Sequence, residues 1–159
     1  MNAAEHQAQL CDSRAALLAA MEGIDEGKLR TRPGPGEWCV VEVLAHMVDV
    51  DNEYLAQALK TVEEPGRQFT YFDDVTWKAE HQDLHLLHLE DVLRDLARSH
   101  ERVVAMARRL SQEALDSPAR HPRGIPYTTG DILLRLATHD RNHTAQIIAM
   151  LAAVGAQHS

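Results

Sequence analysis

The chain of 159 residues has few features of secreted or membrane proteins. It contains only two cysteines, Cys11 and Cys39, and no CxxC pair, so no disulfide framework is indicated. No apolar run approaches the roughly 18–20 residues of a membrane span. Three charged residues, Glu5, Asp12 and Arg14, lie where a signal peptide would be apolar. We therefore expect a cytoplasmic protein without a membrane partner.

The chain also lacks an excess of basic residues. Its 16 lysines and arginines are outnumbered by 24 acidic residues, which gives a formal net charge of −8. Nucleic acids and anionic membrane surfaces bind clusters of lysine and arginine. We therefore expect no nucleic-acid partner, and a small molecule is the expected substrate.

Segments with the two-residue alternation of a β-strand are missing from the sequence. Apolar residues instead recur at helical spacing in four segments. These segments cover about residues 3–21, 39–61, 80–110 and 128–155. Two long connections separate them, at residues 62–78 and 111–127. The pattern predicts a single all-α domain over residues 1–159, folded as a four-helix bundle.

Aromatic residues make up only 4% of the chain, yet four of the seven lie together in the first long connection. They are Phe69, Tyr71, Phe72 and Trp77. Aromatic side chains in a long connection usually hold it against the body of the protein. We expect this role here, and the wall of a pocket is the alternative.

Histidine, by contrast, is abundant. His139 and His143 are four residues apart, so they share one face of a helix, at positions where the apolar stripe calls for leucine or isoleucine. His46 also replaces an apolar residue on the inward face of the second predicted helix. A buried imidazole needs a hydrogen-bond partner or a metal. Three imidazoles from two helices predict a divalent metal site with an open position, most commonly zinc, with nickel, iron or manganese as alternatives. Core histidines without a metal are the simpler interpretation.

Other histidines give a weaker signal. His81, His85 and His88 have a spacing that could also bind a metal within the third predicted helix, but their acidic neighbours favour a solvent-exposed face. His100, in the middle of that helix, is either a fourth ligand or part of a polar contact between helices.

Polar residues beside the predicted site are candidates for supporting roles. Asp49 follows His46 by three residues and could orient its imidazole, or act with Glu53 as a general base. Asp140 directly follows the first histidine of the pair and points about 100° away around the helix, so we expect a surface or capping contact. Gln146 is expected to bond a ligand or to make a contact between helices.

Two motifs resemble the DinB/YfiT-like family over nearly the whole chain. The first runs from Arg32-Pro-Gly-Pro-Gly-Glu-Trp38 through Glu42 to His46-Met-Val-Asp49, and the second is His139-x3-His143-x2-Gln146-Ile147. The resemblance implies an up-down-down-up four-helix bundle, often a homodimer. It also implies a metal site made by the same three histidines. Cys39 stands where the family usually has serine or threonine, so we expect a helix cap weaker by about 1 kcal/mol. A thiolate role for Cys39 is a further alternative.

Characterised members of that family include thiol-dependent S-transferases. The resemblance therefore implies a metal-dependent transferase that uses a low-molecular-weight thiol as cofactor. One alternative is a hydrolase in which the metal activates water and Asp49 or Glu53 assists as a base. Another is a stress protein without turnover, in which the metal only stabilises the bundle.

Overall fold

Four long helices form a bundle in the computed structural model, which describes residues 1–157. They are α1 (Ala3–Met21), α3 (Val40–Glu63), α5 (Leu89–Arg109) and α7 (Thr129–Gln157). Helices α1 and α3 each pack against both α5 and α7, so α1 and α3 lie diagonally across the bundle. The all-α prediction is confirmed. Within the part of the chain that the structure describes, no helix is long and apolar enough to cross a membrane.

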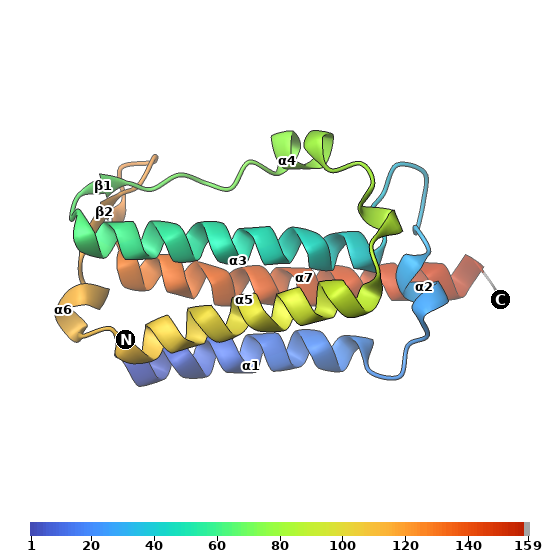
Figure 1. The fold of residues 1–159 in the computed structure, drawn as a ribbon, viewed down its shortest axis with the longest axis horizontal. Coiled ribbons are helices and arrows are strands. Elements are labelled where there is room, and N and C mark those ends of the chain that lie inside the picture. Colours follow the sequence, from blue (N-terminus) through green and yellow to red (C-terminus); the bar gives the residue numbers. More distant parts are fainter. Residues whose placement is uncertain (158–159) are drawn as a thin grey trace.

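The direction of the helices dictates the longest connection. Helices α1 and α7 run one way along the bundle, whereas α3 and α5 both run the other way (Figure 1). Because α3 and α5 are parallel, the chain between them must travel back along the length of the bundle. This crossover, residues 64–88, carries the short helix α4 (Asp74–Glu80) along the outside of α3 (Figure 1).

Short elements complete the fold at the two ends of the bundle. A three-stranded sheet of order β1-β2-β3 joins the two long connections, with β1 parallel to β2 and β2 antiparallel to β3. The strands have only two or three residues, too few to show a two-residue alternation in the sequence. The remaining elements are β1 (Arg67–Gln68), β2 (Pro118–Arg120), β3 (Pro126–Thr128), α2 (Glu26–Arg30), the 3-10 helix η1 (Leu84–Leu86) and α6 (Gln112–Leu115).

The third helix was predicted too long at its start. Helix α4 ends at Glu80 and α5 begins only at Leu89, so His81, His85 and His88 do not share a helix face. Arg30 explains the break, because its guanidinium donates hydrogen bonds to the carbonyl oxygens of residues 85 and 87. Those carbonyls are thereby satisfied outside a helix.

Helix α3 begins directly after Cys39. The backbone N–H of Cys39 donates to the carboxylate of Glu42 at 3.1 Å, and Arg32 pairs with the same carboxylate at 3.1 Å. The thiol is fully buried, and this burial raises the pKa of Cys39. A raised pKa is the opposite of what a thiolate needs, so the structure does not support a thiolate role.

One buried guanidinium connects all four helices. Arg14 of α1 bonds Asp140 of α7 and Asp51 of α3, each at 3.0 Å. It also donates to the carbonyl oxygen of Leu96 in α5 at 3.3 Å. The prediction of a surface or capping role for Asp140 was wrong, because its side chain is only 2% exposed. Its position 100° around α7 from His139 faces α1 rather than solvent.

The carboxylates of this network have further partners. The hydroxyl of Ser99 donates to Asp51 at 2.6 Å, and that of Ser13 donates to Asp140 at 3.3 Å. Buried charges are tolerated only when they are paired and hydrogen-bonded, and here each has at least two partners. The network therefore fixes how the four helices are rotated and shifted against one another.

Replacing Arg14 with methionine tests this role. Arg14→Met leaves two buried carboxylates without their cation, so the free energy of unfolding should fall by about 3–5 kcal/mol. Arg94→Met is the matched control, because it breaks an exposed ion pair with Asp91 within α5 and should cost less than about 1 kcal/mol. Urea denaturation at pH 7 measures both. A loss below about 1 kcal/mol for Arg14→Met would contradict the role.

Candidate metal centre

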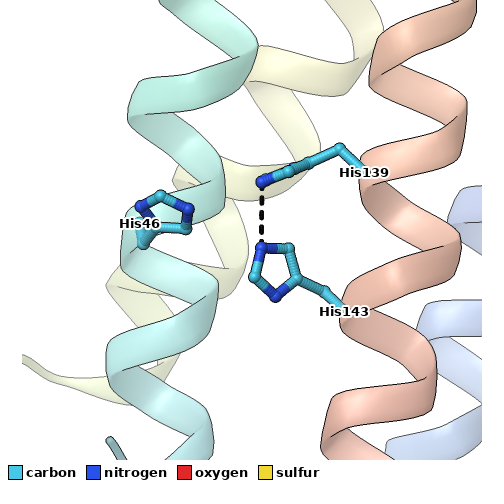
Figure 2. A group of neighbouring side chains, drawn as sticks. All are labelled: His46, His139 and His143. Atoms are coloured by element: carbon cyan, nitrogen blue, oxygen red, sulfur yellow. Dashed lines mark hydrogen bonds between the residues drawn. The ribbon is translucent and has the colours of Figure 1, made fainter. Parts of the chain in front are cut away.

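Three histidines from two packed helices converge on one point. His46 projects from α3 toward α7, and His139 and His143 project from α7 toward α3 (Figure 2). One ring nitrogen of each lies within 4.8 Å of the corresponding nitrogen of the other two. The Nε2 atoms of His139 and His143 are 2.9 Å apart. Among the residues that the structure describes, the converging group contains these three histidines and no others.

Local structure explains the convergence. On α7 the two histidines follow Leu136 by three and seven residues and so continue its buried stripe, which faces α3. The buried Asp140, adjacent to His139, is held by Arg14 and fixes the rotation of α7 about its axis. His46 lies five residues before Asp51, the partner of Arg14 on α3. The same network thus orients both helices that carry the site.

The hydrogen bonds of the three rings differ. The Nδ1 atom of His143 is 2.6 Å from Oε1 of Gln146, so the predicted contact of Gln146 with a histidine of the site is confirmed. The Nε2 atom of His46 is 3.5 Å from a carboxylate oxygen of Asp74. The Nδ1 atoms of His46 and His139 are buried and bond to no residue that the structure describes. An unpaired buried polar atom costs about 1–3 kcal/mol.

Burial keeps these imidazoles neutral. Burial, with a smaller contribution from the neighbouring His143, lowers the pKa of His46 to about 4 and that of His139 to about 2. Burial also lowers the pKa of His143, although its bond to Gln146 opposes the shift. Neutral imidazole is the form that binds metals, so the site is in its ligating form at neutral pH.

The donor set fits a divalent metal. Two imidazole nitrogens that each lie 2.0–2.1 Å from one ion are about 2.9 to 3.4 Å apart at ordinary ligand angles. The 2.9 Å between His139 and His143 falls within this range. The nitrogen of His46 is somewhat farther away and needs a small adjustment of its side chain. Three nitrogen ligands would leave a further coordination position of such an ion for a thiol or water.

The predicted carboxylates of Asp49 and Glu53 do not bond to the histidines of the site. Asp49 accepts a hydrogen bond from the indole N–H of Trp77 at 2.7 Å, and Glu53 accepts one from Gln57 at 3.1 Å. The carboxylate beside His46 is instead Asp74, at the start of α4. The residues around Asp74 in the sequence did not predict this role, because only the folded crossover brings Asp74 next to His46.

Aromatic side chains enclose His46. The rings of Trp38, Phe72 and Trp77 have centroids between 5.1 and 5.3 Å from that of His46. Phe69 is buried in the core and holds the crossover to the bundle, as predicted. Phe72 and Trp77 also wall the site, so the alternative role of the aromatic segment is present as well.

Two clefts share Asp74 in their lining. The first, which we call the Trp38 cleft, has a volume of about 630 Å³ and includes Lys78, Gln146 and Met150 in its lining. The second, the Arg135 cleft, has a volume of about 610 Å³. Its lining includes Tyr54, Tyr71, Tyr127, Arg135 and His139. His139 itself lines the Arg135 cleft, whereas the Trp38 cleft is lined by Trp38, Asp74 and Gln146, which contact His46 or His143.

His100 takes no part in the converging group. It is partly buried near Arg14, and burial together with that positive charge lowers the pKa of His100 to about 4. His100 is therefore not a fourth ligand of this group.

Comparisons with known proteins agree with this architecture. YfiT from Bacillus subtilis, described as a probable metal-dependent hydrolase with an unusual four-helix bundle topology, superimposes with a TM-score of 0.72. The two chains are 20% identical, and the match covers 98% of this chain and 86% of YfiT. TT2238, described as a four-helix bundle protein, has a TM-score of 0.66 at 21% identity, with 93% and 99% of the chains covered.

At the sequence level, no curated protein matches the chain significantly. The family model of the DinB superfamily, however, matches residues 9–147, a range that includes α3, α5, most of α1 and α7, and all three histidines. The chain therefore belongs to the DinB superfamily.

Proposed function

We propose that the protein binds one divalent ion through His46, His139 and His143 and catalyses the transfer of a small thiol to an electrophile. The observation that carries the proposal is the convergence of three neutral imidazoles beside a cleft that His139 lines. When bound, the ion lowers the pKa of a thiol or water that coordinates it. The other steps of the proposed reaction are carried out by side chains of this protein.

Asp74 is the proposed proton acceptor. Its side chain is 68% exposed, and burial of the remainder raises the pKa of Asp74 above its ordinary value. A carboxylate with a raised pKa, in contact with both clefts, can take a proton from a nucleophile near His46. In this proposal Asp74 takes the role predicted for Asp49 and Glu53, because those two bond to Trp77 and Gln57 instead.

The pair of clefts favours a reaction with two organic substrates. Thiol transfer needs one place for the thiol and another for the electrophile, and both clefts adjoin Asp74. The thiol loses its proton to Asp74, and its sulfur forms a bond to an electrophilic carbon. The electron pair displaced from that carbon then receives the proton held by Asp74. The aromatic wall of Trp38, Phe72 and Trp77 restricts the access of water to His46.

Hydrolysis is the second candidate function. It rests on the fold shared with YfiT, itself described as a probable metal-dependent hydrolase, and needs only that water replace the thiol as the proton donor to Asp74. Zinc as the metal, from the set of three imidazoles, and a homodimer as the assembly, from the family resemblance, are further proposals. A bundle that the metal only stabilises is the non-catalytic alternative.

Metal analysis tests the ligand set and the non-catalytic alternative together. A triple variant with glutamine at positions 46, 139 and 143 should lose the single bound ion but keep the melting temperature of the metal-free wild type within a few degrees. The control is His85→Gln, since this exposed histidine lies in η1 outside the cluster and should leave one ion bound. A triple variant that is unfolded, together with a wild type that unfolds when the metal is removed, would favour the stabilising role.

The pH dependence of metal affinity tests the neutral imidazoles. Protons compete with the ion only near and below the pKa of each ligand, and burial lowers this pKa for all three histidines. The apparent zinc affinity should therefore fall by at most about threefold between pH 7.5 and pH 6. Three histidines with the ordinary pKa of about 6.5 would lose about fiftyfold over the same range. Calorimetric titration at the two pH values distinguishes these outcomes.

Replacing Asp74 tests the proton acceptor. With metal-loaded protein, a panel of cellular thiols and electrophiles, and ester and amide probes, Asp74→Asn should lower kcat by about 10²–10⁴-fold. The wild-type rate should fall as the pH drops through the raised pKa of Asp74, and this limb should vanish in the variant. Asp73→Asn is the matched control, since asparagine preserves the cap that Asp73 provides for Thr76. Equal activity in both variants would exclude Asp74 as the base.

The substrate panel separates the two candidate reactions. Conjugation that requires a thiol supports the transferase, whereas hydrolysis of the ester or amide probes without a thiol supports the hydrolase. If metal-loaded wild type catalyses neither, the proposed enzymatic function is contradicted.

A further inference from the structure

Arg135 lies one helical turn before His139 on α7. Four residues of helix rise about 6 Å, so its backbone is close to the candidate metal centre along the same face. The side chain lines the Arg135 cleft together with His139. Its guanidinium carbon lies 4.5 Å from the ring centroid of Tyr71, and the rings of Phe69 and Tyr54 are at 5.7 and 5.9 Å.

The positive charge of Arg135 has no acidic partner among the residues that the structure describes. It donates a hydrogen bond to the hydroxyl of Tyr54 at 3.3 Å. Asp131, one turn earlier on α7, is occupied elsewhere. Its carboxylate accepts from the backbone N–H and the hydroxyl of Thr128, at 2.8 and 3.0 Å.

Arg135 differs from the buried Arg14 in its partners. Arg14 is buried and has two carboxylate partners, whereas Arg135 is half-buried in an open cleft and has none. A guanidinium presents planar donors that match a carboxylate in a two-bond arrangement. The aromatic rings around it hold the side chain in place, so little conformational freedom is lost when an anion binds.

We propose that Arg135 binds the carboxylate of the substrate, and that the electrophile is a small, planar carboxylic acid held in the Arg135 cleft. The inference rests on the proposed function for the chemistry, but the anion site itself can be tested without turnover. A monoanion fits better than a phosphate dianion, because two carboxylates, Asp74 and Asp131, also line this cleft. Tyr54, Tyr71 and Tyr127 provide flat surfaces for an unsaturated or aromatic body.

The same placement sets the direction in which the substrate binds. Arg135 and Asp74 both line the cleft, and Asp74 and His139 belong to its side nearest the metal centre. An acid whose carboxylate is bound by Arg135 therefore directs its other end toward His139. The thiol then approaches from the Trp38 cleft, which also has Asp74 in its lining.

Binding of benzoate and benzamide to the full-length, metal-free chain tests the anion site. The two probes have the same shape and differ in charge, and protein NMR titration gives the dissociation constants. Wild type should bind benzoate at least about tenfold more tightly than benzamide, since hydrogen bonds to charged groups contribute about 1.5–3 kcal/mol. Equal binding of the two probes by wild type would overturn the proposal without recourse to any variant.

Substitutions test whether Arg135 is responsible for the preference for benzoate over benzamide. Arg135→Gln should remove the preference for benzoate, and Arg135→Lys should retain part of it. Arg141→Gln is the matched control, because it removes one positive charge from the same helix at an exposed position that does not line the cleft. An unchanged benzoate preference in folded Arg135→Gln would overturn the proposal.

Steady-state kinetics distinguishes this inference from the proposed function. Arg135→Gln should raise the KM of an acidic electrophile by about tenfold or more and leave the KM of the corresponding neutral amide unchanged. Selective benzoate binding without turnover of any substrate supports the anion site and contradicts only the enzymatic proposal. Turnover with the same KM for acid and amide supports the enzymatic proposal and contradicts the anion site.

Discussion

The pairing of Arg14 with Asp51 and Asp140 is the interaction on which the arrangement of the bundle depends. Apolar packing alone tolerates small slides and rotations of helices, because one aliphatic contact can replace another. A buried guanidinium between two buried carboxylates does not, since each charge left without a partner costs several kcal/mol. One of the carboxylates is adjacent to His139, and the other is five residues from His46. The geometry of the histidines is therefore inherited from an ion network that contains none of them.

The parallel direction of α3 and α5 determines which residues outside the bundle reach the histidines. Because α3 and α5 are parallel, the crossover has to pass along the outside of α3 (Figure 1). This places Asp74 of α4 3.5 Å from His46. The bundle contributes nitrogen donors on rigid helices, while the crossover contributes Asp74 and the ring of Trp77. The converging nitrogen atoms and the carboxylate proposed as the base thus come from structurally different parts of the chain.

The sequence was informative where a residue violated a local pattern. His46, His139 and His143 were identified because imidazoles occupied positions on apolar stripes. It was uninformative where long-range contacts decide a role. Arg14, the partner of Asp140, lies 126 residues away, and Asp74 reaches the site only through the crossover. Arg135 stands out because no acidic side chain among the described residues pairs with it, which no sequence pattern indicates. The continuous third helix was predicted wrongly because Arg30, from another part of the chain, binds the carbonyls at the break.

The distribution of roles along α7 has a consequence for how such proteins diversify. Arg135, His139, His143 and Gln146 lie on one continuous helix, so their spacing is fixed by the geometry of that helix. The residues that face them across the clefts, such as Tyr71, Phe72 and Asp74, belong to a connection that is not part of the bundle. Mutations in that connection can alter which molecules enter and which protons move while the nitrogen donors stay in place. Related chains can therefore acquire different reactions through changes in a segment of about 25 residues, because the helices that carry the histidines need not change.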